Sequence, residues 1–177
     1  MEKYIMGKKE KGESVGGIVE IIVENPPIGL GEPCFDKLHA ELGKALLSIG
    51  TVKAFEIGAG FDAAEMDGSQ NNDRYVKNPN YAKEGVKLEK NYSGGIQGGI
   101  SIGADIIMRV AVKPPSSIGK EQETINKKGD TATVKVEGRH DACIIPRFIP
   151  VAEAMVALTL ADHLLRNRAC QILKDLK

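Results

Sequence analysis

The chain has 177 residues, about the size of one domain, and 42% of them are hydrophobic, which is enough for a packed core. Its 24 Lys and Arg residues match its 24 Asp and Glu residues in number, which argues against a general nucleic-acid-binding protein. Three scattered cysteines do not form a disulfide framework or a zinc site, and neither a signal peptide nor an uncharged membrane span is visible. We therefore expect one unit, residues 1–177, that is cytoplasmic and binds neither nucleic acid nor membrane.

The first third of the chain predicts a strand, a helix and a second strand. The lysine-rich start, residues 1–14, predicts a solvated helix end or arm, and β-branched residues predict a strand over 15–23. A three- and four-residue apolar period then predicts a helix from Pro33 to Gly50, followed by a strand over 52–57. The buried face of this helix should consist of Phe35, Leu38, Leu42, Ala45, Leu46 and Ile49.

The middle of the chain is polar and then rich in glycine. Residues 58–90 predict a long surface loop that contains a short hairpin. Residues 58–63 match the dinucleotide-binding pattern G-x-G-x-x-A, but the polar run that follows leaves no room for its helix, so a tight turn is favoured over a Rossmann site. The paired glycines of residues 94–99 weaken a strand, which indicates the close approach either of a ligand or of another backbone segment.

The last third predicts two more strands and a long helix. The strands cover 105–112 and 131–136, and the helix begins at Pro150 and continues to about Leu173. The apolar face of this helix should consist of Met155, Leu158, Ala161, Leu164 and Leu165. His39 and His163 lie on predicted helices and are expected to be structural or surface residues.

Two polar stretches at strand ends are candidate anion sites. Residues 113–117 (KPPSS) combine an ammonium group with two hydroxyls, although a strand terminator that faces solvent has the same composition. Arg139, His140 and Asp141 offer a guanidinium fork, a group that titrates near neutral pH and a carboxylate base. The alternative for this second stretch is an ordinary surface ion pair.

Taken together and in order, these segments resemble the chorismate synthase family over nearly the whole chain. The matching segments are 14–17, 29–33, 35–38, 55–58, 60–61, 68–70, 94–101, 113–114, 116–117, 139–141, 153–158 and 161–166. The resemblance implies an α/β fold in which helices are layered on a β-sheet. It also implies that this chain corresponds to the C-terminal half of family members, with the N-terminal half and its catalytic histidines absent.

The resemblance further implies a phosphate-eliminating lyase. The family converts 5-enolpyruvylshikimate 3-phosphate to chorismate by a trans-1,4-elimination that requires reduced FMN, with NADPH as a possible flavin reductant, and its members form homotetramers. The alternative is a catalytically incomplete module that binds flavin or phosphate or acts in assembly. A nicotinamide-dependent Rossmann protein is a third and weaker hypothesis.

Matching by position implies roles for individual residues. The catalytic residue would be Asp141. The cofactor-binding residues would be Gly50, Thr51, Gly98, Lys113, Pro114, Pro115, Ser116, Ser117 and Arg139. Three departures from the family pattern occur at or beside these positions. Ala142 stands where the family has proline, Pro115 stands where it has threonine, and Gly50–Thr51 stands where asparagine or proline followed by alanine is commoner.

Overall fold

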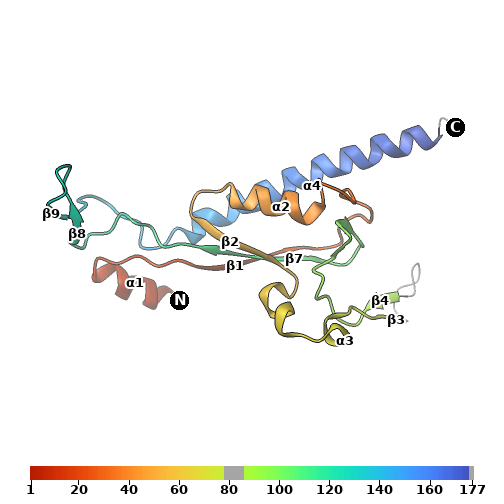
Figure 1. Cartoon of the computed structure of the whole chain (residues 1–177), viewed down its shortest axis with the longest axis horizontal. Coiled ribbons are helices and arrows are strands. Elements are labelled where there is room, and N and C mark those ends of the chain that lie inside the picture. The colour runs from red at the N-terminus through yellow and green to blue at the C-terminus, as the bar shows by residue number, and fades with distance from the viewer. Residues whose placement is uncertain (78–85, 176–177) are drawn as a thin grey trace.

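The computed structural model describes residues 1–77 and 86–175, and its helices and strands form an elongated molecule (Figure 1). The elements are α1 (Glu2–Glu10), β1 (Gly17–Val23), α2 (Leu38–Leu47), β2 (Val52–Ile57), the 3₁₀ helix η1 (Gly60–Glu65), α3 (Gly68–Asn71), β3 (Tyr75–Lys77), β4 (Val86–Leu88), β5 (Ile96–Gln97), β6 (Ile100–Ser101), β7 (Ile106–Val112), β8 (Gln122–Ile125), β9 (Thr131–Val134) and α4 (Ile145–Asp175).

The centre of the molecule is a three-stranded antiparallel sheet in the order β1-β7-β2. Alternate residues of the middle strand β7 are buried, starting with Ile106 and ending with Val112, because successive side chains of a strand point to opposite faces. The opposite face carries the ion pair between Arg109 and Glu56 at 2.8 Å and remains uncovered at Ile18 and Ile22. One face of the sheet therefore builds the core.

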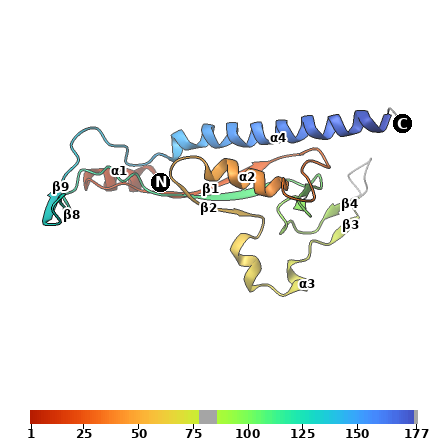
Figure 2. The ribbon, with the colours of Figure 1, turned by 45° about the horizontal axis from the view of Figure 1, so that its top comes forward.

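Helices α2 and α4 cover the buried face of the sheet (Figure 2). Residues from all three strands and both helices share one hydrophobic cluster. Its buried members are Leu30, Leu38, Leu42, Leu46, Val52, Ile96, Ile106, Met108, Val110, Val112, Phe148, Ala152 and Val156. This packing confirms the expected α/β class, with helices layered on a sheet, and the cysteines are free thiols as predicted.

Helix α2 begins five residues later than its sequence pattern predicts. Phe35 has a φ of +60° and is 93% exposed, so it is not part of the buried face. The Glu32 N–H donates to the Asp36 carbonyl at 3.2 Å, and this bond closes a loop that helical geometry would not allow. The first helical N–H, that of Leu38, donates to the Gly99 carbonyl at 2.8 Å. A contact with a distant segment, which local periodicity does not record, therefore sets the start of this helix.

Helix α4 also differs from its prediction, both in its start and in its buried face. It begins at Ile145 and includes Pro150, which has no N–H to donate to the Pro146 carbonyl one turn earlier. The side chains that face the core include Phe148, Ala152 and Val156, whereas Leu158 and Leu165 of the predicted apolar face are exposed. The helix has apolar residues on two sides, and the sheet covers only one of them.

By length and composition alone, the segment Ile145–Gln171 of α4 could span a membrane. Phe148, Ala152 and Val156 of this segment are buried in the core, however, and Arg166 forms an ion pair with Asp36 at 2.7 Å. These contacts are typical of a helix that packs on a soluble core.

The polar middle of the chain contains more structure than predicted. The hairpin expected in this region is present as β3 and β4, and the residues between them, 78–85, lie outside the described part of the chain. The 3₁₀ helix η1 and the short helix α3 precede the hairpin. A second hairpin, β8–β9, extends from the body of the molecule, and its second strand confirms the strand predicted over 131–136 (Figure 1).

Truncation of Leu42 should destabilise the fold far more than truncation of Leu47 in the same helix. Leu42 is 0% exposed and Leu47 is 50% exposed. Leu42→Ala should lower the free energy of unfolding by about 2–5 kcal/mol because it leaves a cavity, and Leu47→Ala by less than about 1 kcal/mol. Urea denaturation followed by circular dichroism measures both values, and equal losses in the two variants would contradict the assigned core.

Candidate functional site

The segment that leads into β1 brings two of the predicted site segments together. The Ser14 hydroxyl donates to the Pro115 carbonyl at 2.5 Å, and the Val15 N–H donates to the Ala142 carbonyl at 2.8 Å. A Cβ on Gly16 would collide with the Val112 carbonyl, so only glycine allows this close approach. We call residues 113–117 the lysine–serine bend and residues 139–141 the Arg139–Asp141 corner. Residues 14–16 thereby hold the bend beside the corner.

Residues 50–51 form a third segment, which contacts the backbone of the lysine–serine bend. The Lys113 N–H donates to the Thr51 carbonyl at 2.9 Å, which places Gly50 and Thr51 next to the end of β7. We call the four segments 14–17, 50–51, 113–117 and 139–142 the strand-end site. They come from distant parts of the sequence and meet where β7 ends.

Thr51 is in a strained conformation within the strand-end site. Its φ is +85°, a value that costs a β-branched residue conformational energy, because the Cβ lies close to the backbone. Its hydroxyl oxygen is buried and has no hydrogen-bond partner among the described residues. A Cβ on the adjacent Gly50 would meet no atom within 4 Å. Thr51 thus combines a strained backbone with an unpaired buried hydroxyl, next to the solvent-exposed Gly50.

The lysine–serine bend presents cationic and hydroxyl groups on the surface. Lys113, Ser116 and Ser117 are exposed, as is Arg139 on the neighbouring corner. Within residues 1–77 and 86–175, neither Lys113 nor Arg139 takes part in an ion pair. Ammonium, guanidinium and hydroxyl groups are of the kinds that bind a phosphate or another oxyanion.

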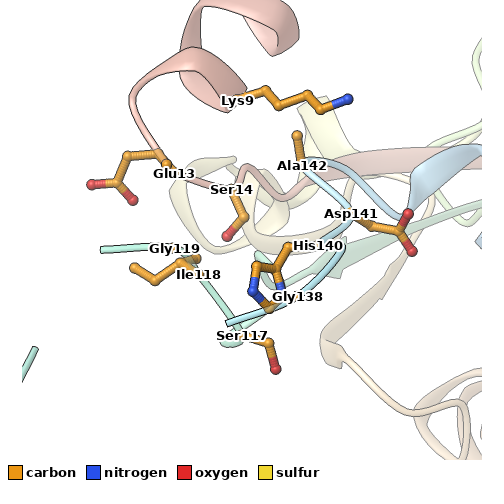
Figure 3. A pocket seen from close by; sticks show the side chains of 11 residues that line it. Lys9, Glu13, Ser14, Ser117, Ile118, Gly119, Gly138, His140, Asp141 and Ala142 are labelled. Carbon is orange, nitrogen blue, oxygen red and sulfur yellow. The ribbon is translucent and has the colours of Figure 1, made fainter. Parts of the chain in front are cut away.

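The Asp141 carboxylate forms an exposed ion pair with Arg147, which is the alternative that the sequence left open for this stretch. Arg147 Nη1 donates to Asp141 Oδ2 at 2.6 Å, and Figure 3 shows this carboxylate turned away from the His140 ring. His140 Nε2 lies 2.9 Å from the Val136 carbonyl oxygen, to which it donates when it carries the proton. The two side chains are therefore oriented by separate partners, and they do not form a pair with each other.

A cavity of about 220 Å³ borders the strand-end site (Figure 3). Its lining brings residues from α1 and the following turn to the bend and the corner, and sequence analysis assigned no role to these residues. The lining residues are Lys9, Gly12, Glu13, Ser14, Ser117, Ile118, Gly119, Gly138, His140, Asp141 and Ala142. The Lys120 ammonium donates to Glu13 at 2.7 Å, and this hydrogen bond and charge lower the pKa of the Glu13 carboxyl. Ser14 and the glycine pair Gly16–Gly17 at the start of β1 are the sequence signal that could have indicated a role for this turn.

Gly98 lies apart from the other predicted cofactor contacts. Its neighbour Gly99 accepts a hydrogen bond from the start of α2, whereas Thr51 follows the end of α2, so the length of the helix separates them. Gly98 has a φ of +61°, and a Cβ there would meet no atom within 4 Å. Its predicted role as a cofactor contact remains a prediction, and within one copy of the chain it does not adjoin the strand-end site.

The other paired glycines serve backbone packing. A Cβ on Gly94 would collide with the backbone of Gly58, one on Gly95 with the Asp105 carbonyl, and one on Gly99 with the Glu32 carbonyl. Of the two explanations that the sequence left open, close backbone approach therefore applies to three of the four glycines.

The G-x-G-x-x-A segment is a tight turn and not a dinucleotide site. Gly58 has a φ of +57°, and a Cβ there would collide with the Tyr92 carbonyl, which accepts a hydrogen bond from Ala59 at 2.8 Å. The following helix η1 is a 3₁₀ helix of six residues and not the α-helix that a pyrophosphate site requires. The Rossmann hypothesis is therefore wrong.

Substitution of Gly58 should reveal this packing role. Gly58→Ala should lower the free energy of unfolding by about 1–3 kcal/mol, because it combines an unfavourable φ with a backbone collision. Gly68→Ala is the matched control, since Gly68 begins α3 and its Cβ would meet no atom within 4 Å. Thermal unfolding of both variants measures the difference, and an unchanged Gly58→Ala protein would disprove the assigned contact.

Comparisons with known proteins agree on one family. A model of the chorismate synthase family matches residues 1–165. Chorismate synthase from Cytophaga hutchinsonii is 51% identical over 174 residues, which are 97% of this chain and 47% of that protein. Chorismate synthase from Prochlorococcus marinus strain MIT 9312 is 50% identical over 168 residues, 94% of this chain and 46% of that protein.

A solved structure supports the same likeness. A crystal structure of chorismate synthase is similar with a TM-score of 0.72 at 33% identity, over 94% of this chain and 42% of that one. The chain thus spans about half the length of the relatives that it matches.

Proposed function

This chain belongs to the chorismate synthase family, and we propose that it builds the part of a chorismate synthase active site that binds phosphate and flavin. The observation that carries this proposal is the strand-end site, where the strained Thr51, the free Lys113 and the Arg139–Asp141 corner meet. Because the chain spans about half the length of its relatives, we propose that turnover also requires the segment that those relatives have in addition.

The proposed reaction is a trans-1,4-elimination from 5-enolpyruvylshikimate 3-phosphate. The C–O bond to phosphate breaks, a ring carbon loses a proton, and a new double bond forms, so no net electrons are exchanged. The negative charge that develops on the leaving phosphate has to be stabilised, and preorganised cations and hydroxyls do this well. Lys113, Ser116, Ser117 and Arg139 supply such groups at the strand-end site.

The family is flavin-dependent, and we propose FMN as the cofactor. Two features of the chain fit this group, namely the unpaired hydroxyl of Thr51 and the open position of Gly50 beside it. When bound, reduced FMN supplies transient electron density that helps phosphate to leave. Gly50, Thr51 and the bend from Lys113 to Ser117 would hold it.

We assign Asp141 to proton removal at this site. A carboxylate acts as a general base when it lies within hydrogen-bond reach of the proton that it removes, and the ion pair with Arg147 at 2.6 Å orients Asp141. Ala142 replaces the proline of the family pattern, but the Val15 N–H bond to the Ala142 carbonyl fixes the same corner. The pyrrolidine ring of Pro115 removes a hydroxyl and an amide donor relative to threonine, and Ser116 and Ser117 remain as donors.

The cellular setting of this proposal follows from the relatives. Biosynthetic enzymes of this kind act in the cytosol, and we propose the same location for this chain, within a homo-oligomer of the size that the family forms. Exposed apolar residues on the outer sheet face, among them Ile18 and Ile22, are consistent with assembly.

Substitution of Asp141 tests the catalytic assignment. The chain is co-expressed with the unmatched segment of Cytophaga hutchinsonii chorismate synthase, and reduced FMN and 5-enolpyruvylshikimate 3-phosphate are added. Asp141→Asn should lower kcat by about 10²–10⁴-fold, because a general base is lost, with flavin affinity largely kept. Asp130→Asn, on an exposed residue of the β8–β9 turn, should keep full activity.

Flavin titration and chorismate formation are measured separately in this experiment. Near-normal kcat in Asp141→Asn would remove Asp141 from the mechanism. Flavin binding without turnover in the unsubstituted pair would favour the alternative function, a binding or assembly module, over a complete enzyme.

A further inference from the structure

The lysine–serine bend has few backbone groups with which to bind an anion. The Lys113 N–H donates to the Thr51 carbonyl at 2.9 Å, and the two prolines that follow have no N–H. No hydrogen bond among the described residues uses the N–H of Ser116 or that of Ser117. These two N–H groups are therefore the backbone donors that the bend can offer to a phosphate oxygen.

One backbone angle decides where the Ser116 N–H points. The pyrrolidine ring of Pro115 fixes φ of that residue, so ψ is its remaining freedom. The peptide bond between Pro115 and Ser116 is trans, and the carbonyl and the N–H of a planar trans peptide point in opposite directions. Rotation about ψ of Pro115 therefore turns the Pro115 carbonyl and the Ser116 N–H together.

Ser14 holds this angle from outside the bend. Its hydroxyl donates to the Pro115 carbonyl at 2.5 Å, between residues that are 101 positions apart in the sequence. Figure 3 shows the Ser14 side chain pointing from the turn after α1 toward the segment of Ser117, whose own side chain points away from Ser14. Because the Pro115 carbonyl faces Ser14, the Ser116 N–H points away from Ser14 as well.

Neighbouring contacts keep Ser14 itself in place. On one side, the Lys120 ammonium donates to the Glu13 carboxylate at 2.7 Å. On the other side, the Val15 N–H donates to the Ala142 carbonyl at 2.8 Å. The Ser14 hydroxyl thus belongs to a segment that is tied down on both sides, so it can act as a fixed support for the bend.

We infer that Ser14 is a positioning residue of the strand-end site, whose hydroxyl sets the Pro115 carbonyl and thereby aims the Ser116 N–H at a bound phosphate monoester. The inference rests on the proposed function for the presence of a phosphate at the bend. A hydrogen bond to a charged phosphate is strong only when the N–H is directed at an oxygen. A threonine at position 115, as in the family pattern, would add an N–H of its own and leave φ free, so the dependence on Ser14 follows from the proline of this chain.

Residual dipolar couplings of the ligand-free chain test the orientation directly, because the coupling of the Ser116 N–H reports the direction of that bond. Ser14→Ala should average this coupling toward zero, since no other described contact fixes ψ of Pro115. Ser14→Thr keeps a hydroxyl and should retain the unsubstituted value. Thr159→Val is the matched control, because it removes a hydroxyl that donates to the Met155 carbonyl at 2.9 Å within α4, and it should leave the coupling unchanged.

Titration with phosphate esters tests the binding role in the same variants. The isotope-labelled chain, together with the unmatched segment of the Cytophaga hutchinsonii enzyme, is titrated separately with FMN, with 5-enolpyruvylshikimate 3-phosphate and with riboflavin, which lacks the phosphate. The shift of the Ser116 amide resonance gives each Kd. Ser14→Ala should weaken the affinity for the phosphate ester that binds at the bend at least about tenfold, and Ser14→Thr should restore it. The first two titrations show whether this phosphate belongs to the flavin or to the substrate.

Three results would overturn the inference. The first is a Ser116 N–H coupling that Ser14→Ala leaves unaltered, and the second is an affinity loss that Ser14→Thr does not restore. The third is an equal response of the Ser116 amide to riboflavin and to the phosphate esters. Binding of a phosphate ester that Ser14→Ala leaves unchanged would refute the role of Ser14 and keep the proposed function. No binding by the unsubstituted protein would refute the proposed function, and the ligand-free couplings would then decide the role of Ser14 by themselves.

Discussion

The close approach of the first strand to the end of the central strand is the constraint on which the strand-end site depends. Gly16 lies so close to the Val112 carbonyl that no side chain would fit. The two preceding residues, Ser14 and Val15, donate hydrogen bonds to the carbonyls of Pro115 and Ala142. Without this contact the lysine–serine bend and the Arg139–Asp141 corner would be two independent surface turns. With it, the two segments lie beside each other at one edge of the sheet.

The same edge contains a residue in a strained backbone conformation. Thr51 has a left-handed backbone although its side chain is β-branched, and its buried hydroxyl lacks a partner among the described residues. Such a residue persists only where its surroundings hold it in place, and here the Lys113 N–H binds its carbonyl. The stability for this arrangement comes from the core, where β7 is covered by α2 and α4. A rigid sheet and a strained edge are the usual division between scaffold and site.

Helix α4 has apolar residues on two sides. Its inner face completes the core of this chain. The exposed apolar residues on its opposite side are Val151, Ala154, Leu158, Ala161 and Leu165. A helix that is apolar on two sides belongs in the interior of a larger fold. The chain covers less than half of each relative reported above, and α4 has exposed apolar residues on the side away from the sheet.

The sequence by itself determined the strands over 15–23, 52–57 and 105–112, because β-branched and alternating apolar runs favour extended backbone. It also identified the lysine–serine bend and the Arg139–Asp141 corner as chemical groups, since residue type alone defines their charge and hydrogen bonding. Local periodicity failed at Phe35 and at Leu158, both of which were assigned to buried faces and are exposed. Phe35 lies in the loop before α2, and Leu158 lies on the side of α4 that the sheet does not cover, so the period marked neither the start of the one helix nor the buried side of the other.

Only the tertiary structure decided which distant residues meet. It joined Ser14 to Pro115 and Thr51 to Lys113, and it separated Gly98 from them by the length of α2. It also showed that Gly58 packs on the Tyr92 carbonyl, which ended the dinucleotide hypothesis. A sequence pattern fixes what each residue can do, but long-range packing fixes where it stands, because contacts between residues a hundred positions apart leave no local period.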